Sequence, residues 1–219
     1  MQILEAVIQE FIDAGEPVSS GSLYERYNFG IKPAMIRLEL DSLEDEGFLE
    51  QPHHSAGRVP TDNGYELFVK KLLGIEAPAP EPREQHTMKE LFEERAWPDL
   101  LHRLSAELGL LSIAADLSHE MVYKSGLDNL VKHLDWQDRE EINSVIRDFE
   151  EVDERLPRAT EKWEEGPKIF IGKKSPVTRS ESLSVIGANY RVGDDIISIL
   201  AIGPKRMDYK KTIRIFRGL

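Results

Sequence analysis

Apolar residues recur every three to four positions through the first seventy residues, which is the spacing of one buried helix face. The spacing predicts a first helix that ends at Gly15 and a short second helix capped by Ser19 or Ser20. A third helix is predicted from Pro33 to Gly47. Proline suits the first turn of a helix because its missing N–H has no partner there. Three helices are therefore expected before residue 48.

A two-stranded hairpin is expected after these helices. Phe48–His53 and Arg58–Thr61 are predicted as its strands, with Ser55–Gly57 between them, and Asp62 can cap a fourth helix. Helix, short helix, helix and hairpin is the order of a winged helix-turn-helix. In that fold the third helix enters a DNA major groove and the hairpin contacts flanking phosphates. The first seventy residues are therefore predicted to form this module.

The second half of the chain mixes helical and strand-like patterns. The predicted helices cover residues 100–108, 127–134, 135–156 and 207–216, and the predicted strands cover residues 110–117, 168–172, 183–190 and 195–203. Strands flanked by helices predict an α+β fold. The amphipathic helix whose apolar stripe runs from Trp136 to Val152 is a candidate surface for a second copy of the chain. The alternative is that this stripe packs on its own sheet.

Proline content divides the chain near residue 74. Gly74–Pro82 holds three prolines in nine residues, which is typical of a semi-rigid linker. We expect an N-terminal domain over residues 1–73, a linker over residues 74–95 and a second domain over residues 96–219.

The chain is acidic, with a formal net charge of −12. Residues 1–73 hold 6 Lys/Arg and 13 Asp/Glu, which argues against non-specific coating of nucleic acid. Between residues 28 and 69 the cations are Lys32, Arg37 and Arg58, and all three lie where a winged helix meets DNA. A protein-contact module or a solvated acidic helix is the alternative interpretation.

Catalytic and metal-binding patterns are missing from the sequence. There are no cysteines, and the six histidines lack the spacing of a metal site. The segment GPKIFIGKK does not have the glycine spacing of a phosphate loop. We therefore expect no enzymatic activity, cofactor or metal. We also expect no membrane association and a cytoplasmic location, because no basic n-region of a signal peptide and no apolar stretch of membrane-spanning length is found.

Two separated strings resemble the heat-inducible transcription repressors of the HrcA family. The first is GEPVSSGSL at 15–23 followed by RYNFGIKPAMIRLELDSLEDEGFLEQPHHSAGRVPTDNGYELFV at 26–69, and the second is YRVGDDIISILAIGPKRMDYKKTI at 190–213. The resemblance implies a winged helix followed by a reduced GAF-like domain. It also implies that this chain is a shortened member of the family. The segment that it lacks relative to the family pattern would lie between about Leu117 and Met121.

The resemblance places the DNA-contacting residues on the second and third predicted helices and on the hairpin. These candidate residues are Ser22, Lys32, Met35, Arg37, Leu38, His54 and Arg58. Met35 and Leu38 stand where the family pattern has Thr and Asn, and Gly21-Ser22 replaces an Arg–Thr pair. Because Met and Leu offer only apolar contact, for example to a thymine methyl, the sequence of the family's operator cannot be assumed for this chain. Arg37 is expected to contact a base, and Arg58 a phosphate or a narrow minor groove.

Taken with the resemblance, these residues predict a transcriptional repressor of heat-shock (chaperone) genes. It would bind double-stranded operator DNA with inverted-repeat symmetry as a homodimer, and the resemblance implies the GroE chaperonin as a further partner. Two other functions stay open. One is a regulator that senses a ligand in its second domain, and the other is a winged-helix protein-interaction module without affinity for DNA.

Overall fold

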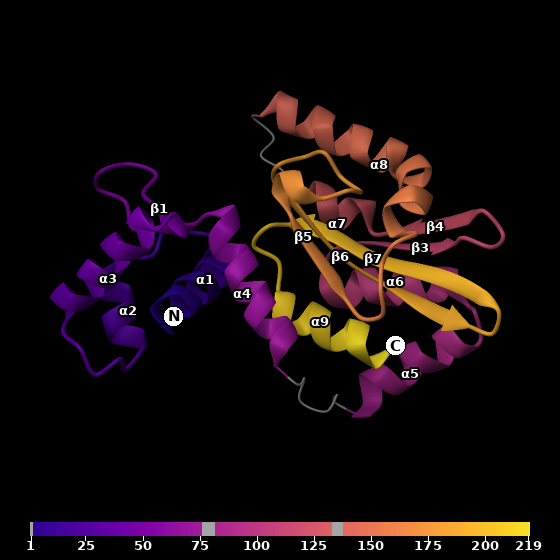
Figure 1. Cartoon of the computed structure of the whole chain (residues 1–219), viewed down its shortest axis with the longest axis horizontal. Helices are drawn as coiled ribbons and strands as arrows, with labels where there is room; N and C mark the ends of the chain where they lie inside the picture. The colour runs from indigo at the N-terminus through magenta and orange to yellow at the C-terminus, as the bar shows by residue number, and fades with distance from the viewer. Residues whose placement is uncertain (1, 76–81, 133–137) are drawn as a thin grey trace. The chain divides into compact units, whose positions relative to one another are not determined.

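The computed structural model describes residues 2–75, 82–132 and 138–219 (Figure 1). The chain divides into two compact units, Met1–Gly74 and Ile75–Leu219, and each is described by itself.

Four helices and a short pair of strands form the N-terminal unit. The helices are α1 (Gln2–Ala14), α2 (Ser20–Arg26), α3 (Pro33–Asp45) and α4 (Asp62–Gly74), and the strands are β1 (Leu49–Glu50) and β2 (Val59–Pro60). The two strands pair antiparallel, with Leu49 opposite Pro60. Each strand has only two residues, whereas the sequence predicted six and four. Pro52 lacks an amide donor, so the ladder cannot extend normally past residue 51.

The N-terminal core is built from the apolar positions that predicted the helices. Buried side chains come from all four helices and from β1, namely Ile3, Leu4, Val7, Ile8, Leu23, Ile36, Leu40, Leu49, Tyr65, Phe68 and Val69. Ser19 caps α2, since its hydroxyl accepts a hydrogen bond from the Ser22 amide. The three helices expected before residue 48 are therefore present at nearly their predicted bounds.

The C-terminal unit contains one five-stranded antiparallel sheet. Its strands are β3 (Leu111–Asp116), β4 (Met121–Ser125), β5 (Lys168–Ile171), β6 (Leu183–Val192) and β7 (Asp195–Pro204), in the order β4-β3-β7-β6-β5. The helices are α5 (Pro82–Glu93), α6 (Trp97–Leu108), α7 (Leu127–Val131), α8 (Arg139–Thr160) and α9 (Tyr209–Gly218), with a short 3₁₀ turn at Gly172–Lys174. Strands and helices together confirm the predicted α+β class.

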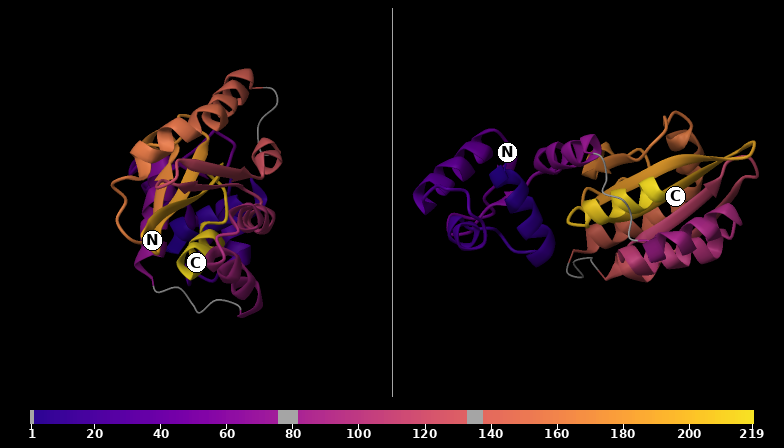
Figure 2. Two further views of the ribbon diagram at one scale, coloured as in Figure 1. Left: turned by 90° about the vertical axis from the view of Figure 1, so that its right-hand side faces the viewer. Right: turned by 90° about the horizontal axis from the view of Figure 1, so that it is seen from below.

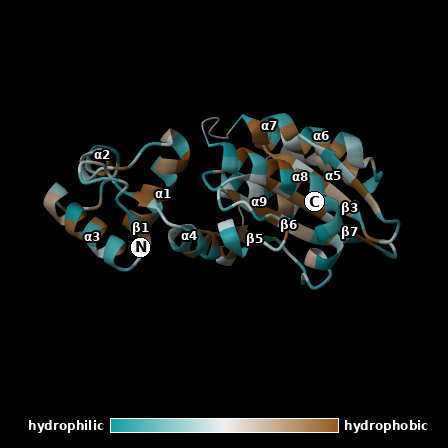
Figure 3. Ribbon diagram, turned by 90° about the horizontal axis from the view of Figure 1, so that it is seen from above, coloured by the Kyte–Doolittle hydropathy of each residue, from teal (hydrophilic) through white to brown (hydrophobic). Residues whose placement is uncertain are grey.

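Helices cover both faces of this sheet (Figures 1 and 2). On one face, Val145, Val152 and Leu156 of α8 pack in a core with β3, β6 and β7. On the other face α6 contacts β3 and β4, and α9 contacts β6. In Figure 3 apolar and polar stretches alternate along the helices, as expected when one side of each helix faces a core. The apolar stripe of α8 therefore packs on its own sheet, although Ile146 is exposed.

One segment differs from the expected linker. Residues 82–93, within the predicted linker 74–95, form helix α5. Its Met88 and Phe92 are buried, and the Phe92 ring contacts the rings of Trp97 and Tyr190 with centroids 5.6 and 5.2 Å apart. Proline content suggested a linker, but burial of these two side chains fixes residues 82–93 as part of the second unit.

The last helix of the second unit, α9, begins with a side-chain cap. Asp208 caps α9, since its carboxylate accepts a hydrogen bond from the Lys211 amide at 2.9 Å. Leu134 and Trp136, predicted on helices, lie outside the described residues. In the part of the chain that the structure describes, no helix combines the length and apolarity needed to cross a membrane.

Candidate nucleic-acid interface

Helix α3 presents one face to the core and the opposite face to solvent. Ile36 and Leu40 are buried, whereas Met35, Arg37 and Leu38 are exposed. At 100° per residue Leu38 lies almost opposite the buried pair, and Met35 and Arg37 flank it on either side. The exposed N-terminal half of α3 is therefore apolar at its centre with a guanidinium at one edge.

Exposed apolar side chains gather on α2 and α3. Leu38 is 60% exposed, Met35 47% and Tyr24 51%. Large apolar side chains with this exposure are informative when they occur together on neighbouring elements. Helices α2 and α3 pack against each other, so these three side chains belong to one part of the unit. Tyr24 was not among the predicted residues, although its position next to the buried Leu23 indicates an outward side chain.

The two cations of α3 are available for an external partner. Lys32 precedes the first turn of α3 and Arg37 follows one turn later, and both are exposed. Neither side chain forms an ion pair within the described residues. Four acidic residues lie at the other end of the helix, namely Asp41, Glu44, Asp45 and Glu46. The positive charge of α3 is therefore confined to its N-terminal half.

Arg58 has a different environment from the expected one. Its side chain is only 13% exposed, and Nη2 lies 2.7 Å from Oδ1 of Asp41 while Nε lies 2.8 Å from Oε2 of Glu44. The guanidinium thus neutralises part of the acidic half of α3. This placement departs from the expected phosphate contact, because two carboxylates of its own unit already engage it.

The backbone around Arg58 is held by a close approach to the α1–α2 connection. Val18 and Arg58 form a backbone bridge, with N···O distances of 2.9 and 2.8 Å. At Gly57 a Cβ atom would lie 2.3 Å from the Val18 carbonyl oxygen, so only glycine fits there. Thr61 then donates a hydrogen bond to the Gly47 carbonyl oxygen at 2.6 Å. The segment from Gly57 to Thr61 therefore ties the hairpin to the rest of the unit.

Residues 51–58 form an ordered loop beyond the two strands. The Gln51 side chain donates hydrogen bonds to the carbonyl oxygens of His54 at 3.2 Å and Ala56 at 2.8 Å. This internal role of Gln51 was missed, since an amide at a predicted strand position gives no signal of it. His54 is exposed on the loop.

Ser22, the predicted site residue on α2, has an internal partner. Its hydroxyl donates a hydrogen bond to the Ser19 carbonyl oxygen at 3.0 Å, as part of the cap of α2.

The structure therefore divides the predicted site residues into two groups. Lys32, Met35, Arg37 and Leu38 lie together on the exposed half of α3, and His54 lies on the loop. Ser22 and Arg58 are engaged in internal hydrogen bonds and ion pairs. Such a surface offers apolar contact and two donors, which suits binding rather than catalysis. Within the described residues no group of three or more His, Asp or Glu is arranged to hold a metal ion.

The chain is similar to known repressors over part of its length. It is 51% identical over 75 residues to the heat-inducible transcription repressor HrcA of Streptomyces avermitilis, which is 34% of this chain and 22% of that protein. The repressor of the same name from Clostridium perfringens strain SM101 is 51% identical over 76 residues, which is 35% of this chain and 22% of that protein. The matches thus span about a fifth of the length of these relatives.

A solved structure has the same fold. A protein described as a hypothetical protein, whose crystal structure was determined at 2.2 Å, matches 99% of this chain and 94% of its own with a TM-score of 0.81. Sequence identity to it is 19%, so this likeness describes the fold alone.

The family is assigned by the C-terminal part of the sequence. A family described as "HrcA protein C terminal domain" matches residues 68–213, about two thirds of the chain. The curated relatives carry the name of transcription repressors, so the family is one of regulators and not of enzymes, as the sequence indicated. By this match the chain belongs to the HrcA family.

Proposed function

We propose that the chain is a sequence-specific DNA-binding repressor of heat-shock (chaperone) genes. In this proposal the N-terminal unit is a winged helix-turn-helix, α3 enters the major groove, and the loop 51–58 lies over the flanking backbone. The observation that carries the proposal is the exposed half of α3, where Lys32 and Arg37 border the apolar pair Met35 and Leu38. Family membership supports it, since the curated relatives are named repressors.

The roles of the individual residues follow from their surroundings. Arg37 is the candidate for a base contact, because a guanidinium binds guanine O6 and N7 with two hydrogen bonds. Met35 and Leu38 would contact thymine methyl groups. Lys32 and His54 would contact phosphates. Arg58, engaged by Asp41 and Glu44, would act by positioning the loop against α3.

The proposal includes a homodimer on an inverted-repeat operator in the cytoplasm. One helix reads only a few base pairs, and two-fold symmetry doubles the contacts. The reduced GAF-like second unit is proposed to form the dimer. Release by heat or by the GroE chaperonin rests on family membership alone. Light scattering at micromolar concentration should show a particle of twice 25.0 kDa.

Selection of bound sequences from random DNA tests the proposal. The chain should enrich an inverted repeat, and Arg37→Ala should weaken the preference at one position in each half-site by about 1–3 kcal/mol. Lys70→Ala is the matched control, because Lys70 is an exposed cation on α4 rather than on α3. If no sequence is enriched, or if both variants behave like wild type, this face does not read DNA and the protein-interaction module is favoured.

A further inference from the structure

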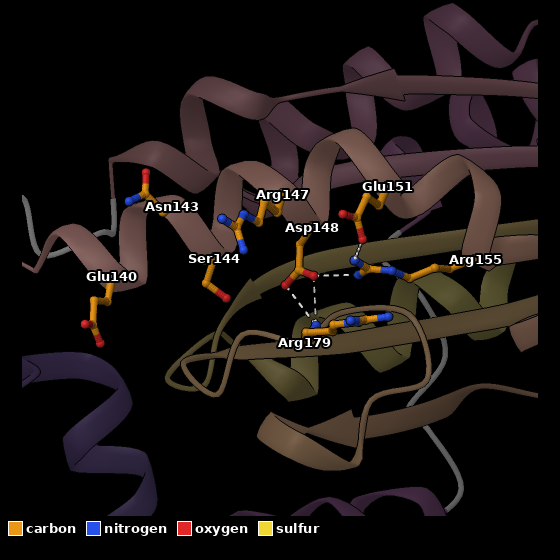
Figure 4. Close-up of a pocket in the computed structure, with 8 residues that line it drawn as sticks. All are labelled: Glu140, Asn143, Ser144, Arg147, Asp148, Glu151, Arg155 and Arg179. Atoms are coloured by element: carbon orange, nitrogen blue, oxygen red, sulfur yellow. Dashed lines mark hydrogen bonds and ion pairs between the residues drawn. The ribbon is translucent and has the colours of Figure 1, made fainter.

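A polar pocket of about 340 Å³ lies in the second unit, far along the chain from α3 (Figure 4). Helix α8 forms one wall, and the segment that contains Arg179 forms the other. The lining residues are Glu140, Asn143, Ser144, Arg147, Asp148, Glu151, Arg155 and Arg179. Pockets that bind small molecules start at about 300 Å³, so this volume suits a small ligand. Its lining is made of charged and polar side chains, without a large apolar one.

Buried Asp148 fixes the two walls of the pocket to each other. Its carboxylate is nearly inaccessible and accepts hydrogen bonds from the backbone amides of Arg179 and Ser180, the latter at 2.8 Å. It also accepts one from Nη1 of Arg155 at 2.6 Å. Nη1 of Arg155 donates in turn to the Val177 carbonyl oxygen at 3.0 Å. The wall that carries Arg179 is therefore anchored to α8 without the help of a ligand.

Three arginines line the pocket, and they differ in their ion pairs. The Arg155 guanidinium forms ion pairs with Asp148 and Glu151, so it is not available to a ligand. Arg147 and Arg179 are exposed, and their side chains form no ion pair within the residues that the structure describes. The hydrogen bond from Arg155 lowers the pKa of the Glu151 carboxyl, and the charges of Arg179 and Arg147 lower it further. Arg147 lines the pocket from α8 and Arg179 lines it from the opposite wall, so both can reach an anion bound in it (Figure 4).

The remaining lining groups are neutral, except for one carboxylate. Ser144 contributes a hydroxyl and Asn143 an amide, and these can hydrogen-bond to hydroxyl groups. The carboxylate is that of Glu140, which forms no ion pair with an arginine of the pocket within the described residues. Unengaged guanidinium groups with polar neighbours suit phosphate, because the planar fork of arginine matches two phosphate oxygens at once.

We propose that this pocket binds a small phosphorylated metabolite that carries hydroxyl groups, of the sugar phosphate class. Arg147 and Arg179 contact its phosphate, and Ser144 and Asn143 contact its hydroxyl groups. The preformed wall around Asp148 lowers the cost of binding, because the ligand does not have to order it. This inference does not depend on DNA binding, so the two proposals fail separately.

Isothermal titration calorimetry of the full chain tests the pocket, with ribose 5-phosphate, inorganic phosphate, ribose and succinate as probes. Ribose 5-phosphate should bind most tightly, inorganic phosphate more weakly, and ribose not at all. Arg147→Gln and Arg179→Gln should each weaken binding of ribose 5-phosphate about tenfold, the loss expected for one charge-assisted hydrogen-bonding group. Arg158→Gln is the matched control on α8, because Arg158 is exposed and does not line the pocket.

A gain of affinity provides the complementary test. Glu140→Gln should tighten binding of ribose 5-phosphate several-fold because it removes a repelling carboxylate, whereas Glu154→Gln, outside the pocket on the same helix, should not. Thermal unfolding of each variant establishes that it is folded. No saturable binding of ribose 5-phosphate at millimolar concentration would overturn the proposal, as would an equal loss in Arg158→Gln. Succinate binding as tightly as ribose 5-phosphate would also overturn it, because the site would then recognise anions without preference for phosphate.

Discussion

Nη2 of Arg58 lies 2.7 Å from Oδ1 of Asp41, and the same guanidinium reaches Glu44. This pairing joins the end of the hairpin loop to the acidic half of α3. It also changes the electrostatics of the proposed DNA-binding surface. One positive charge offsets one of the two negative charges of Asp41 and Glu44, which would repel phosphates, and the cation that does so is mostly buried.

Removing this guanidinium should lower the stability of the N-terminal unit. Arg58→Ala leaves Asp41 and Glu44 without their partner beside Asp45 and Glu46. Both carboxylates are partly exposed, so solvent screens part of the loss, and we expect about 1–2 kcal/mol in urea unfolding. Arg37→Ala, at an exposed position without an ion pair in the described structure, should change the free energy of unfolding by less than about 0.5 kcal/mol. Equal values for the two variants would contradict the positioning role.

The salt dependence of operator binding should reflect two cations per chain instead of three. If the charges of Lys32 and Arg37 each neutralise one phosphate, a dimer neutralises four, which predicts a slope of log K against log salt of roughly −3.5. Lys32→Ala should flatten this slope by about two. Arg58→Ala should weaken binding without flattening it. Fluorescence anisotropy over a series of salt concentrations measures both quantities.

The outcome for Arg58 decides between two roles. A slope near −5 for wild type, flattened by Arg58→Ala, would mean that DNA displaces Asp41 and Glu44 and that Arg58 contacts phosphate after all. Lys70→Ala is the control here too, and its slope should equal that of wild type.

Met35 and Leu38 should set an operator preference different from that of a family member with polar residues there. The double variant Met35→Thr, Leu38→Asn exchanges two apolar contacts for groups that donate and accept hydrogen bonds. We expect the selected half-site to change at one or two positions, with stability unchanged, because both side chains are already exposed. An identical selected site for wild type and the double variant would show that these side chains do not face the bases.

The helices and the α+β class could be predicted from periodicity, because each helix buries one stripe. Ile36 and Leu40 show this for α3, and Val145 and Val152 for α8. Helix α5 could not be predicted in this way, because its burial depends on a ring contact between Phe92 and Tyr190, which are 98 positions apart in the sequence. Residue spacing within a single segment carries no information about such a partner.

The candidate site was predictable only in part, for a related reason. The exposure of Leu38, with Met35 and Arg37 on either side of it, follows from helix geometry, which turns this face away from the buried stripe. The place of Lys32 follows from Pro33, which begins the helix directly after it. The role of Arg58 does not follow, because its partners are set by the close approach of Gly57 to Val18. That contact brings the guanidinium next to Asp41, 17 positions away.

Asp148 should be a main determinant of stability in the second unit. Asp148→Ala removes the acceptor for two backbone amides and leaves the mostly buried Arg155 with fewer partners. Breaking a buried ion pair on one side costs about 3–5 kcal/mol, and we expect a loss near the lower value because Glu151 remains. Urea unfolding followed by circular dichroism measures it. Glu154→Ala, at an exposed position on the same helix, should have little effect. A loss below about 1 kcal/mol for Asp148→Ala would contradict the anchoring role.

Tyr190 should make the second unit sensitive to alkaline pH. Its hydroxyl donates a hydrogen bond to the Phe216 carbonyl oxygen at 2.6 Å, and burial raises the pKa of this hydroxyl. In the unfolded chain a tyrosine ionises near pH 10. The folded state therefore keeps a proton that the unfolded state loses. The contribution of the Tyr190 hydroxyl to the free energy of unfolding is therefore fully present below about pH 10, and it is lost as the pH rises further.

The comparison of wild type with Tyr190→Phe isolates this effect from the other tyrosines. At about pH 8 the variant should be less stable by about 1 kcal/mol, the value of one hydrogen bond. Above pH 10 the difference should shrink by up to about 1.4 kcal/mol per pH unit, because phenylalanine cannot ionise in the unfolded state. Phe92→Leu disturbs the same ring contact but keeps the hydroxyl, so its loss of stability should not depend on pH. A difference between wild type and Tyr190→Phe that stays constant from about pH 8 to 11 would show that the hydroxyl ionises equally in both states.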